Sequence, residues 1–343
     1  MSVVLAQLVR SGLIESTHSG YLILIGPDGS DLLTLGDVDA EMYPRSAIKS
    51  LQAAAMVRLG LVLNDEQLAL VCASHGGTER HQEVALEILK SAGLSELDLQ
   101  NTPDRPIDRK ARISWGTKPV TSLAANCSGK HAGMLATCVV NGWDVKTYRD
   151  ADHPLQIAIA NEIKDLIGQP VSRTSVDGCG APLFSMSTRS IAVAARKMRI
   201  DSDPVFKKVI SACLKHPEMI LAEGAYDTRM MRAVPGLLVK GGAESVMLAS
   251  LADGSAIAWK ISDGSNRANG PIMKAALAKL GITIEGEVVD VLGGGTVVGS
   301  LSATFQSALP FNHECPNCNL DGAYLAPGST RNWRCRRHEH LCS

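Results

Sequence analysis

The 343-residue sequence has almost no net charge, because its 34 Lys and Arg residues nearly balance its 35 Asp and Glu residues. This balance gives no electrostatic reason to expect nucleic acid or an anionic membrane as a partner. A long apolar run is also missing. The apolar run within residues 1–12 is too short for a secretory signal, and no later stretch is long and apolar enough to span a membrane. We therefore expect a cytoplasmic protein with no nucleic-acid or membrane partner.

Internal repeats and low-complexity linkers are likewise missing from the body of the chain. Since 45% of the residues are hydrophobic and 20% are charged, a chain of this length can bury a large core. The composition thus describes a globular protein.

Strand patterns lie near both ends of the chain. Paired apolar runs flank Asp-Gly turns at 20–35 and 245–261 and predict β-hairpins, and 236–242 predicts one further strand. Between the ends, apolar residues recur at three and four positions, as in 82–94 and 153–168, which predicts helices. The fold class we expect is α/β: an antiparallel sheet built from both ends of the chain, flanked by helices, with an α-rich middle lobe.

The same patterns divide the chain. We expect residues 1–312 to form a single unit that carries every motif described below. Its sheet lobe covers about 1–60 and 232–312, and its helical lobe covers about 61–231. Residues 313–343 form a tail rich in Cys and His.

The nine cysteines do not indicate disulfides, since in a reducing compartment cysteines are core residues, metal ligands or catalysts. In the tail, Cys315 and Cys318 form C-x2-C, and Cys335 with His338 forms C-x2-H, a spacing that suits a small zinc ribbon. Few apolar residues lie between these pairs to cover a metal, and His340 and Cys342 offer competing ligands. We therefore expect a flexible extension whose removal leaves the activity nearly unchanged.

The stretch 43-YPRSAIKSLQ-52 places Ser46 three residues before Lys49 at a predicted helix start. Pro44 suits the first turn of a helix, and Lys49 would lie one turn along on the same face as Ser46. A serine hydroxyl becomes a nucleophile only when a base takes its proton, and lysine is such a base only if burial or a nearby cation keeps it neutral. An ordinary solvated helix also produces this spacing, so the stretch alone leaves both interpretations open.

Two more stretches place polar residues in apolar or glycine-rich settings. In 70–81 an apolar, strand-like run ends in Ser74, His75 and two glycines, which allow close approach of a ligand. In 236–245 Lys240 closes an apolar strand, where it can depress the pKa of another lysine or neutralise an oxyanion or substrate carboxylate. Each residue also has a structural interpretation. Ser74 can cap a turn, His75 can be a hydrogen-bonded polar neighbour, and Lys240 can be a charge on an edge strand.

Cysteines stand in two further polar stretches, NCSGKHAGML and DGCGAP. Cys127, Lys130 and Cys179 supply two soft ligands and an amine, but a cysteine nucleophile with His131 as its base, or simply buried thiols, fit the residues as well. A phosphate loop is excluded, because Ala124 stands at its required glycine and His131 at its Ser or Thr.

Five motifs in this order closely resemble the asparaginase II family, the Rhizobium-type L-asparaginases, whose fold is similar to serine β-lactamases and glutaminases. The resemblance runs from Gly12 to Gly299 and is carried by PRSAIK, CASHGG, NCSGKHAGML, DGCGAP and LVKGGAE. It implies that residues 1–312 are a catalytic unit.

The resemblance also implies roles for particular residues. It implies two Ser-Lys tandems, Ser46 with Lys49 and Ser74 with Lys240, in which Ser46 is the nucleophile. It implies a structural or substrate-positioning zinc held by Cys127, Lys130 and Cys179. The substrate-binding residues that we expect are Arg45, His75 and Asp177, of which Asp177 would receive the α-ammonium of the substrate.

The expected activity is hydrolysis of the side-chain amide of L-asparagine to L-aspartate and ammonia through a serine acyl-enzyme. The same chemistry would open a β-lactam or a D-amino-acid peptide. A catalytically inactive, metal-binding protein on the same scaffold is the alternative from a different class. We further expect a homodimer.

Overall fold

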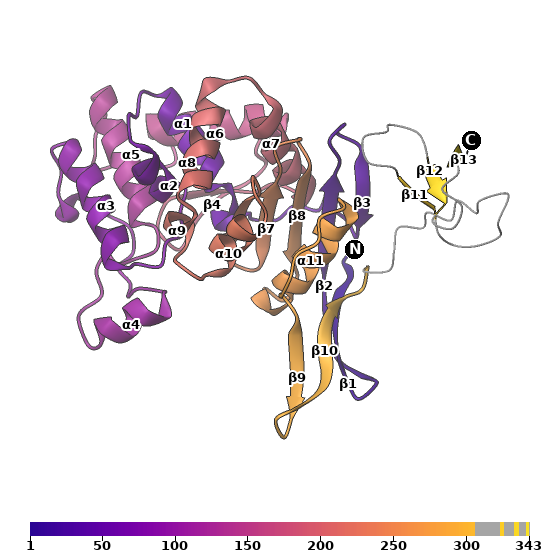
Figure 1. The fold of residues 1–343 in the computed structure, drawn as a ribbon. Helices are drawn as coiled ribbons and strands as arrows, with labels where there is room; N and C mark the ends of the chain where they lie inside the picture. Colours follow the sequence, from indigo (N-terminus) through magenta and orange to yellow (C-terminus); the bar gives the residue numbers. More distant parts are fainter. Residues whose placement is uncertain (306–322, 326–332, 336–340, 343) are drawn as a thin grey trace. The chain divides into compact units, whose positions relative to one another are not determined.

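The computed structural model describes residues 1–305, 323–325, 333–335 and 341–342 (Figure 1). The chain divides into two units, Met1–Thr304 and Phe305–Ser343. The second unit contains an antiparallel sheet of three short strands, β11 (Ala323–Leu325), β12 (Trp333–Cys335) and β13 (Leu341–Cys342). The predicted division at residue 312 lies outside the described residues, as do four candidate tail ligands, Cys315, Cys318, His338 and His340.

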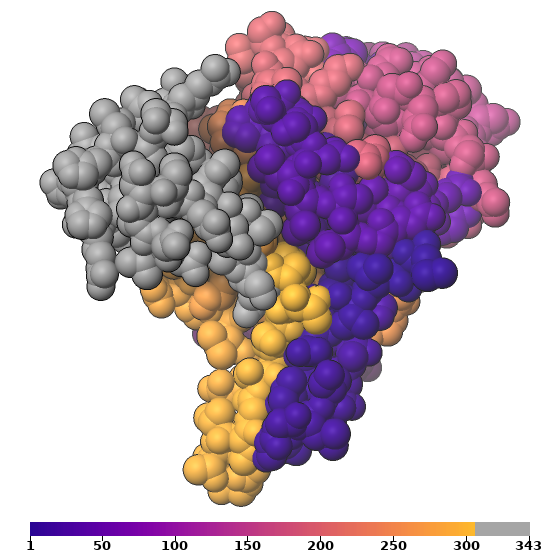
Figure 2. Space-filling view, turned by 90° about the vertical axis from the view of Figure 1, so that its right-hand side faces the viewer, coloured from indigo at the N-terminus to yellow at the C-terminus, as the bar shows by residue number. Residues whose placement is uncertain are grey.

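An eight-stranded antiparallel sheet forms the centre of the first unit. Seven strands lie side by side, in the order β6 (Leu238–Gly242), β7 (Val246–Ser250), β8 (Ala256–Ile261), β2 (Leu13–Ile25), β1 (Val3–Arg10), β10 (Thr296–Ala303) and β9 (Val289–Gly293). β3 (Asp31–Leu35) pairs with β2. Figure 2 shows the indigo N-terminal strands beside the orange strands from residues 289–303. The predicted sheet from both ends of the chain is confirmed, as are the hairpins β2–β3 and β7–β8.

Helices fill the middle of the sequence and flank the sheet (Figure 1). They are α1 (Lys49–Arg58), α2 (Asp65–Val71), α3 (Glu79–Ser91), α4 (Arg109–Trp115), α5 (Ser128–Asn141), α6 (Pro154–Ile167), α7 (Thr188–Ile200), α8 (Pro204–Lys215), α9 (Pro217–Ile220), α10 (Tyr226–Ala233) and α11 (Asn269–Lys279). Short 3-10 turns η1 (Arg45–Ile48), η2 (Glu96–Asp98) and η3 (Asn266–Ala268), and the strand pair β4 (Thr174–Val176) and β5 (Pro182–Phe184), complete the unit. The α-rich middle lobe is thus confirmed.

Side chains of a strand point alternately to the two faces of the sheet, and all five residues of β7 are buried. The sheet is therefore covered on both faces there. α7 packs against β2, β7 and β8. The indole of Trp259 in β8 is fully buried, and its Nε1 donates to Asn269 Oδ1 of α11 at 3.0 Å. Among the described residues, no helix combines the length and apolarity needed to cross a membrane.

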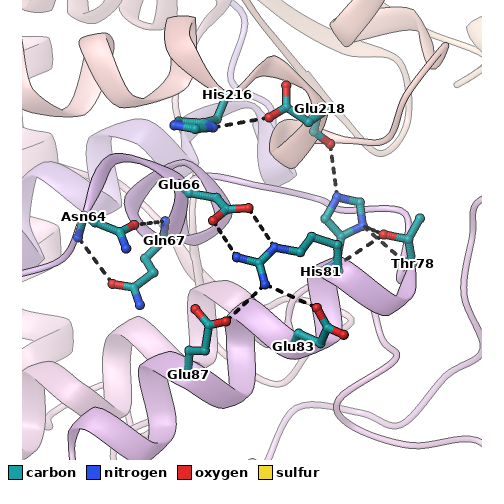
Figure 3. Close-up of polar contacts among 10 residues, drawn as sticks. Asn64, Glu66, Gln67, Thr78, His81, Glu83, Glu87, His216 and Glu218 are labelled. Atoms are coloured by element: carbon teal, nitrogen blue, oxygen red, sulfur yellow. Dashed lines mark hydrogen bonds and ion pairs between the residues drawn. The ribbon is translucent and has the colours of Figure 1, made fainter.

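The strand-like run predicted before Ser74 is wrong: these residues end helix α2. A buried helix and a buried strand both produce continuous apolar runs, and here the helix is fixed by its cap. Asn64 Oδ1 accepts a hydrogen bond from the Gln67 backbone amide at 2.9 Å, and Gln67 Oε1 accepts one from the Asn64 backbone amide at 3.3 Å (Figure 3).

A second polar cluster ties α2 to α3 around the Arg80 guanidinium. Arg80 pairs with Glu66 of α2 at 2.6 Å and with Glu83 and Glu87 of its own helix, α3 (Figure 3). At the start of α3, Thr78 and His81 form a capping box. The loop between these two helices carries Ser74, so both of its ends are held.

Candidate functional site

Ser46 lies in a tight turn that packs against the sheet edge. The predicted helix start is present, with η1 as its first turn and α1 continuing from Lys49. Arg45 adopts a left-handed φ of 51°, a conformation that favours glycine. A Cβ on Gly242 of β6 would lie 2.6 Å from Pro44 O and 3.2 Å from Ser46 N. Only glycine therefore lets β6 approach this turn so closely.

Lys49, Ser74 and Lys240 meet in the interior. Lys49 Nζ lies 3.2 Å and Lys240 Nζ lies 3.3 Å from Ser74 Oγ. The two lysines are 1% and 2% exposed. Within the described residues, Ser46 Oγ forms no hydrogen bond to Lys49, so the structure joins the two predicted pairs at Ser74. The result is one hydroxyl between two buried amines.

Burial shifts the Lys240 amine toward its neutral form. Loss of solvation, reinforced by the charge of Lys49, lowers the pKa of Lys240 to about 8, although Asp227 opposes the shift. The carboxylate of Asp227 is held nearby, since its Oδ2 accepts a hydrogen bond from the Gly241 amide at 2.8 Å. An amine with this pKa can exchange a proton near neutral pH.

Next to these amines lie the two cysteines and the third lysine of the predicted zinc site. Cys127 Sγ is 3.3 Å from Lys49 Nζ, and Cys179 Sγ is 3.3 Å from Lys130 Nζ. A hydrogen bond between the two thiols raises the pKa of Cys127 and lowers the pKa of Cys179, which favours a thiolate at Cys179. Two sulfurs and an amine thus lie together at the N-terminal end of α5 and in the loop before β5.

This donor set fits zinc, for which thiolate sulfur and nitrogen are preferred ligands. A zinc ion held by the two thiols would take the Lys130 amine as its third donor from this cluster. The described part of the chain holds no group of three His, Cys, Asp or Glu side chains suited to a metal.

His131, the alternative base for a cysteine, is fully buried, and burial lowers its pKa to about 4. Its Nδ1 lies 2.6 Å from Tyr148 Oη, and its Nε2 has no hydrogen-bond partner among the described residues. The ring is therefore neutral at physiological pH.

A small cavity adjoins this cluster. Its volume is about 240 Å³, below the roughly 300–1,000 Å³ of pockets for drug-sized ligands. Its lining comprises Arg45, Ser46, Thr102, Pro103, Asp104, Ala125, Asn126, Cys127, Asp177, Gly178, Cys179 and Ala243. A larger hollow of about 690 Å³, bordered by α3 and α4, is lined by none of the predicted site residues. We place the site at the smaller cavity, because its lining includes the predicted site residues Ser46, Cys127 and Cys179.

Arg45 and Asp177 form an ion pair on the cavity wall. Arg45 Nε donates to Asp177 Oδ1 at 2.7 Å, and the Gly178 amide donates to the same oxygen at 2.9 Å. The side chains are 27% and 12% exposed. The charge of Asp177 is therefore already compensated, which bears on its predicted role as the receiver of an ammonium.

His75 lies elsewhere than the sequence suggests. We expect it to contact substrate, but its side chain is fully buried and does not line the described cavity. Its Nε2 lies 2.9 Å from Ser128 Oγ, and its Nδ1 accepts a hydrogen bond from the Gly77 amide at 3.1 Å. Both ring nitrogens are thus used in holding the loop after Ser74, and the substrate contact of His75 stays a prediction.

Sequence reasoning missed three polar side chains of the cavity, Thr102, Asp104 and Asn126. Asn126 immediately precedes Cys127, and its Oδ1 accepts a hydrogen bond from that thiol at 2.9 Å, so its place in a polar motif was a usable signal. The segment with Thr102 and Asp104 has no periodicity and no motif to mark it.

Solved structures with similar folds are distant in sequence. A crystal structure of Mglu in its native form is 13% identical with a TM-score of 0.41, and the match covers 78% of this chain and 66% of that chain. SurE with D-Leu is 16% identical with a TM-score of 0.31, covering 81% and 71% of the two chains. A simvastatin synthase mutant from Aspergillus terreus is 12% identical with a TM-score of 0.27, covering 71% and 84%. The chain spans slightly less than two thirds of the Mglu chain.

No curated protein matches the sequence. A family profile does: the profile described as L-asparaginase II matches residues 6–296. This range contains all five motifs and every residue of the cavity. The chain therefore belongs to the L-asparaginase II family.

Proposed function

We propose that this chain is an amidohydrolase that converts L-asparagine to L-aspartate and ammonia through a serine acyl-enzyme. The observation that carries the proposal is the position of Ser74 Oγ between the buried amines of Lys49 and Lys240. Lys49 also contacts Cys127, which lines the same cavity as Ser46. Membership of the L-asparaginase II family supports the amidohydrolase class.

In the proposed first half-reaction, Ser46 Oγ attacks the side-chain amide carbon while its proton passes to the Lys49 amine. The C–N bond then breaks, and the leaving nitrogen departs as ammonia with a proton delivered through Ser74 and Lys240. The contacts of 3.2 and 3.3 Å at Ser74 Oγ support the part of this path that runs from Lys49 through Ser74 to Lys240.

In the second half-reaction, water adds to the carbonyl of the Ser46 ester. The C–O bond to the serine breaks, L-aspartate leaves, and the hydroxyl of Ser46 regains its proton. The pKa of Lys240, lowered to about 8 by burial, supports its use as a proton carrier in both half-reactions.

The cavity suits a small zwitterion. Its volume of about 240 Å³ favours a free amino acid over a peptide. Arg45 supplies a cation that can pair with a carboxylate, and Asp177 fixes the guanidinium through a 2.7 Å contact.

Cys127, Lys130 and Cys179 would hold the zinc that we propose as a cofactor. When bound, zinc would supply a fixed positive charge beside the cavity. The chain's own residues already connect this cluster to the reaction, because the Cys127 thiol and Ser74 hydroxyl both contact Lys49. Cys127, one of the proposed zinc ligands, would thus help to orient Lys49.

The experiment is to measure ammonia release from L-asparagine and L-glutamine beside turnover of nitrocefin, a chromogenic β-lactam, with purified full-length chain. We expect asparagine to be the best substrate. Faster nitrocefin turnover would replace the proposal with a β-lactam hydrolase. No turnover of any of the three, by protein with its zinc bound, would favour the inactive metal-binding alternative.

A further inference from the structure

Asp104 lies on the cavity wall in a segment that the backbone holds firmly. Its amide donates to Thr121 O at 3.1 Å, and the Thr121 amide donates to Asp104 O at 3.2 Å. Just before it, Asn101 Nδ2 donates to Ser122 O at 2.8 Å and Ser122 Oγ donates to Asn101 O at 2.7 Å. Four hydrogen bonds thus fix the position from which the Asp104 side chain reaches the cavity.

A further hydrogen bond links this segment to the Asp177 loop. Thr102 Oγ1 donates to Gly178 O at 2.8 Å, directly beside Asp177. Arg45, Asp104 and Asp177 all line the same cavity. Any ligand in this small space therefore meets one guanidinium and two carboxylates.

The two carboxylates differ in what already neutralises them. Asp177 Oδ1 receives Arg45 Nε and the Gly178 amide, so its charge is compensated. Asp104 Oδ1 accepts a hydrogen bond only from the adjacent Arg105 amide, at 2.7 Å, and no described cationic side chain forms an ion pair with it. Asp104, which is exposed to solvent, is thus the carboxylate of the cavity wall that has no ion-pair partner among the described residues.

We propose that Asp104 accepts the α-ammonium group of an amino-acid ligand, while Arg45, oriented by Asp177, binds the α-carboxylate. This inference rests on the proposed function, because it assumes that the cavity binds asparagine. An α-amino acid carries an ammonium and a carboxylate group on the same carbon, and the cavity wall offers a carboxylate, Asp104, for the first and the guanidinium of Arg45, held by Asp177, for the second. Asp177 is then a positioning residue for Arg45 and not the receiver of the ammonium.

The test compares two ligands that differ only in the ammonium group, L-asparagine and succinamate, its analogue without the α-amino group. Binding is measured by calorimetry on full-length Ser46→Ala protein, so that turnover does not consume the ligand. We expect this protein to bind L-asparagine at least about tenfold more tightly than succinamate, the range of a charge-assisted hydrogen bond. Adding Asp104→Asn should reduce the difference to less than about threefold, through weaker asparagine binding alone.

Two control variants are made in the same Ser46→Ala background. Asp152→Asn removes an exposed carboxylate that does not line the cavity, and it should leave both affinities unchanged. Asp177→Asn should weaken both ligands together, because Arg45 loses the contact that orients it. The inference is overturned if Asp104→Asn weakens both ligands equally, or if Asp177→Asn alone removes the preference for L-asparagine.

Ammonia release by the unmodified chain separates this inference from the proposed reaction. If the unmodified chain releases no ammonia but the binding preference depends on Asp104, the hydrolysis fails and the ammonium site stands. If ammonia is released and Asp104→Asn leaves the preference intact, the site fails and the hydrolysis stands. Failure of Ser46→Ala protein to bind either ligand overturns the site.

Discussion

Replacing Gly242 by alanine should displace the nucleophile without touching any catalytic side chain. The new Cβ would lie 2.6 Å from Pro44 O, about 0.8 Å short of the 3.4 Å at which ordinary contact begins, and 3.0 Å from Ala47 N. Both atoms belong to backbone, so η1 and Ser46 have to move by several tenths of an ångström. Because a misplacement of about 1 Å can cost 100-fold in rate, we expect kcat to fall about 10- to 100-fold.

The assay is ammonia release from L-asparagine, with thermal unfolding followed in parallel. Overpacking of this kind should also lower the free energy of unfolding by about 1–3 kcal/mol. Gly293→Ala is the control on β9 of the same sheet, since its Cβ would meet only side-chain atoms outside the candidate site, Val298 Cγ1 at 3.1 Å and Val298 Cγ2 at 3.2 Å. Equal kcat losses in the two variants would refute the link between β6 packing and the placement of Ser46.

Two further predictions concern protons and metal. Because burial lowers the pKa of Lys240 to about 8 and only the neutral amine accepts a proton, kcat/KM should rise about tenfold per pH unit up to about pH 8 and then level off. A flat profile from pH 6 to 9 would contradict this role, and Lys240→Arg, which cannot lose its proton, should be inactive. Elemental analysis should find one zinc at the Cys127, Lys130 and Cys179 site, bound more weakly below neutral pH because the ligands must lose protons. A Cys179→Ala protein that binds this zinc as tightly as the unmodified chain would rule out the ligand set.

Local patterns made the sheet predictable. The two hairpins carry Asp28-Gly29 and Asp253-Gly254 between apolar runs, and both glycines adopt the positive φ that such turns use. The end of α2 was mistaken for a strand because a buried apolar run has no visible period. Helix and strand therefore become distinguishable there only through the Asn64 cap.

Sequence motifs pointed to part of the candidate site, but not to its contacts. Motifs identified Ser74 and Lys240, yet these side chains are 166 positions apart, and no sequence period reports that they touch. His75 belongs to a motif but is fully buried and does not line the described cavity, and a serine and an amide use its ring nitrogens. Asp104 has no motif and enters the cavity only through long-range backbone pairing with Thr121.

The central claim is that Ser46 is the nucleophile of an L-asparagine amidohydrolase. Its most direct test is ammonia release by Ser46→Ala protein, with folding checked by circular dichroism and zinc content checked by elemental analysis. We predict that turnover is abolished while fold and metal are unchanged. Retention of more than about a tenth of the unmodified rate, a barrier increase of under ~1.4 kcal/mol, would contradict the claim.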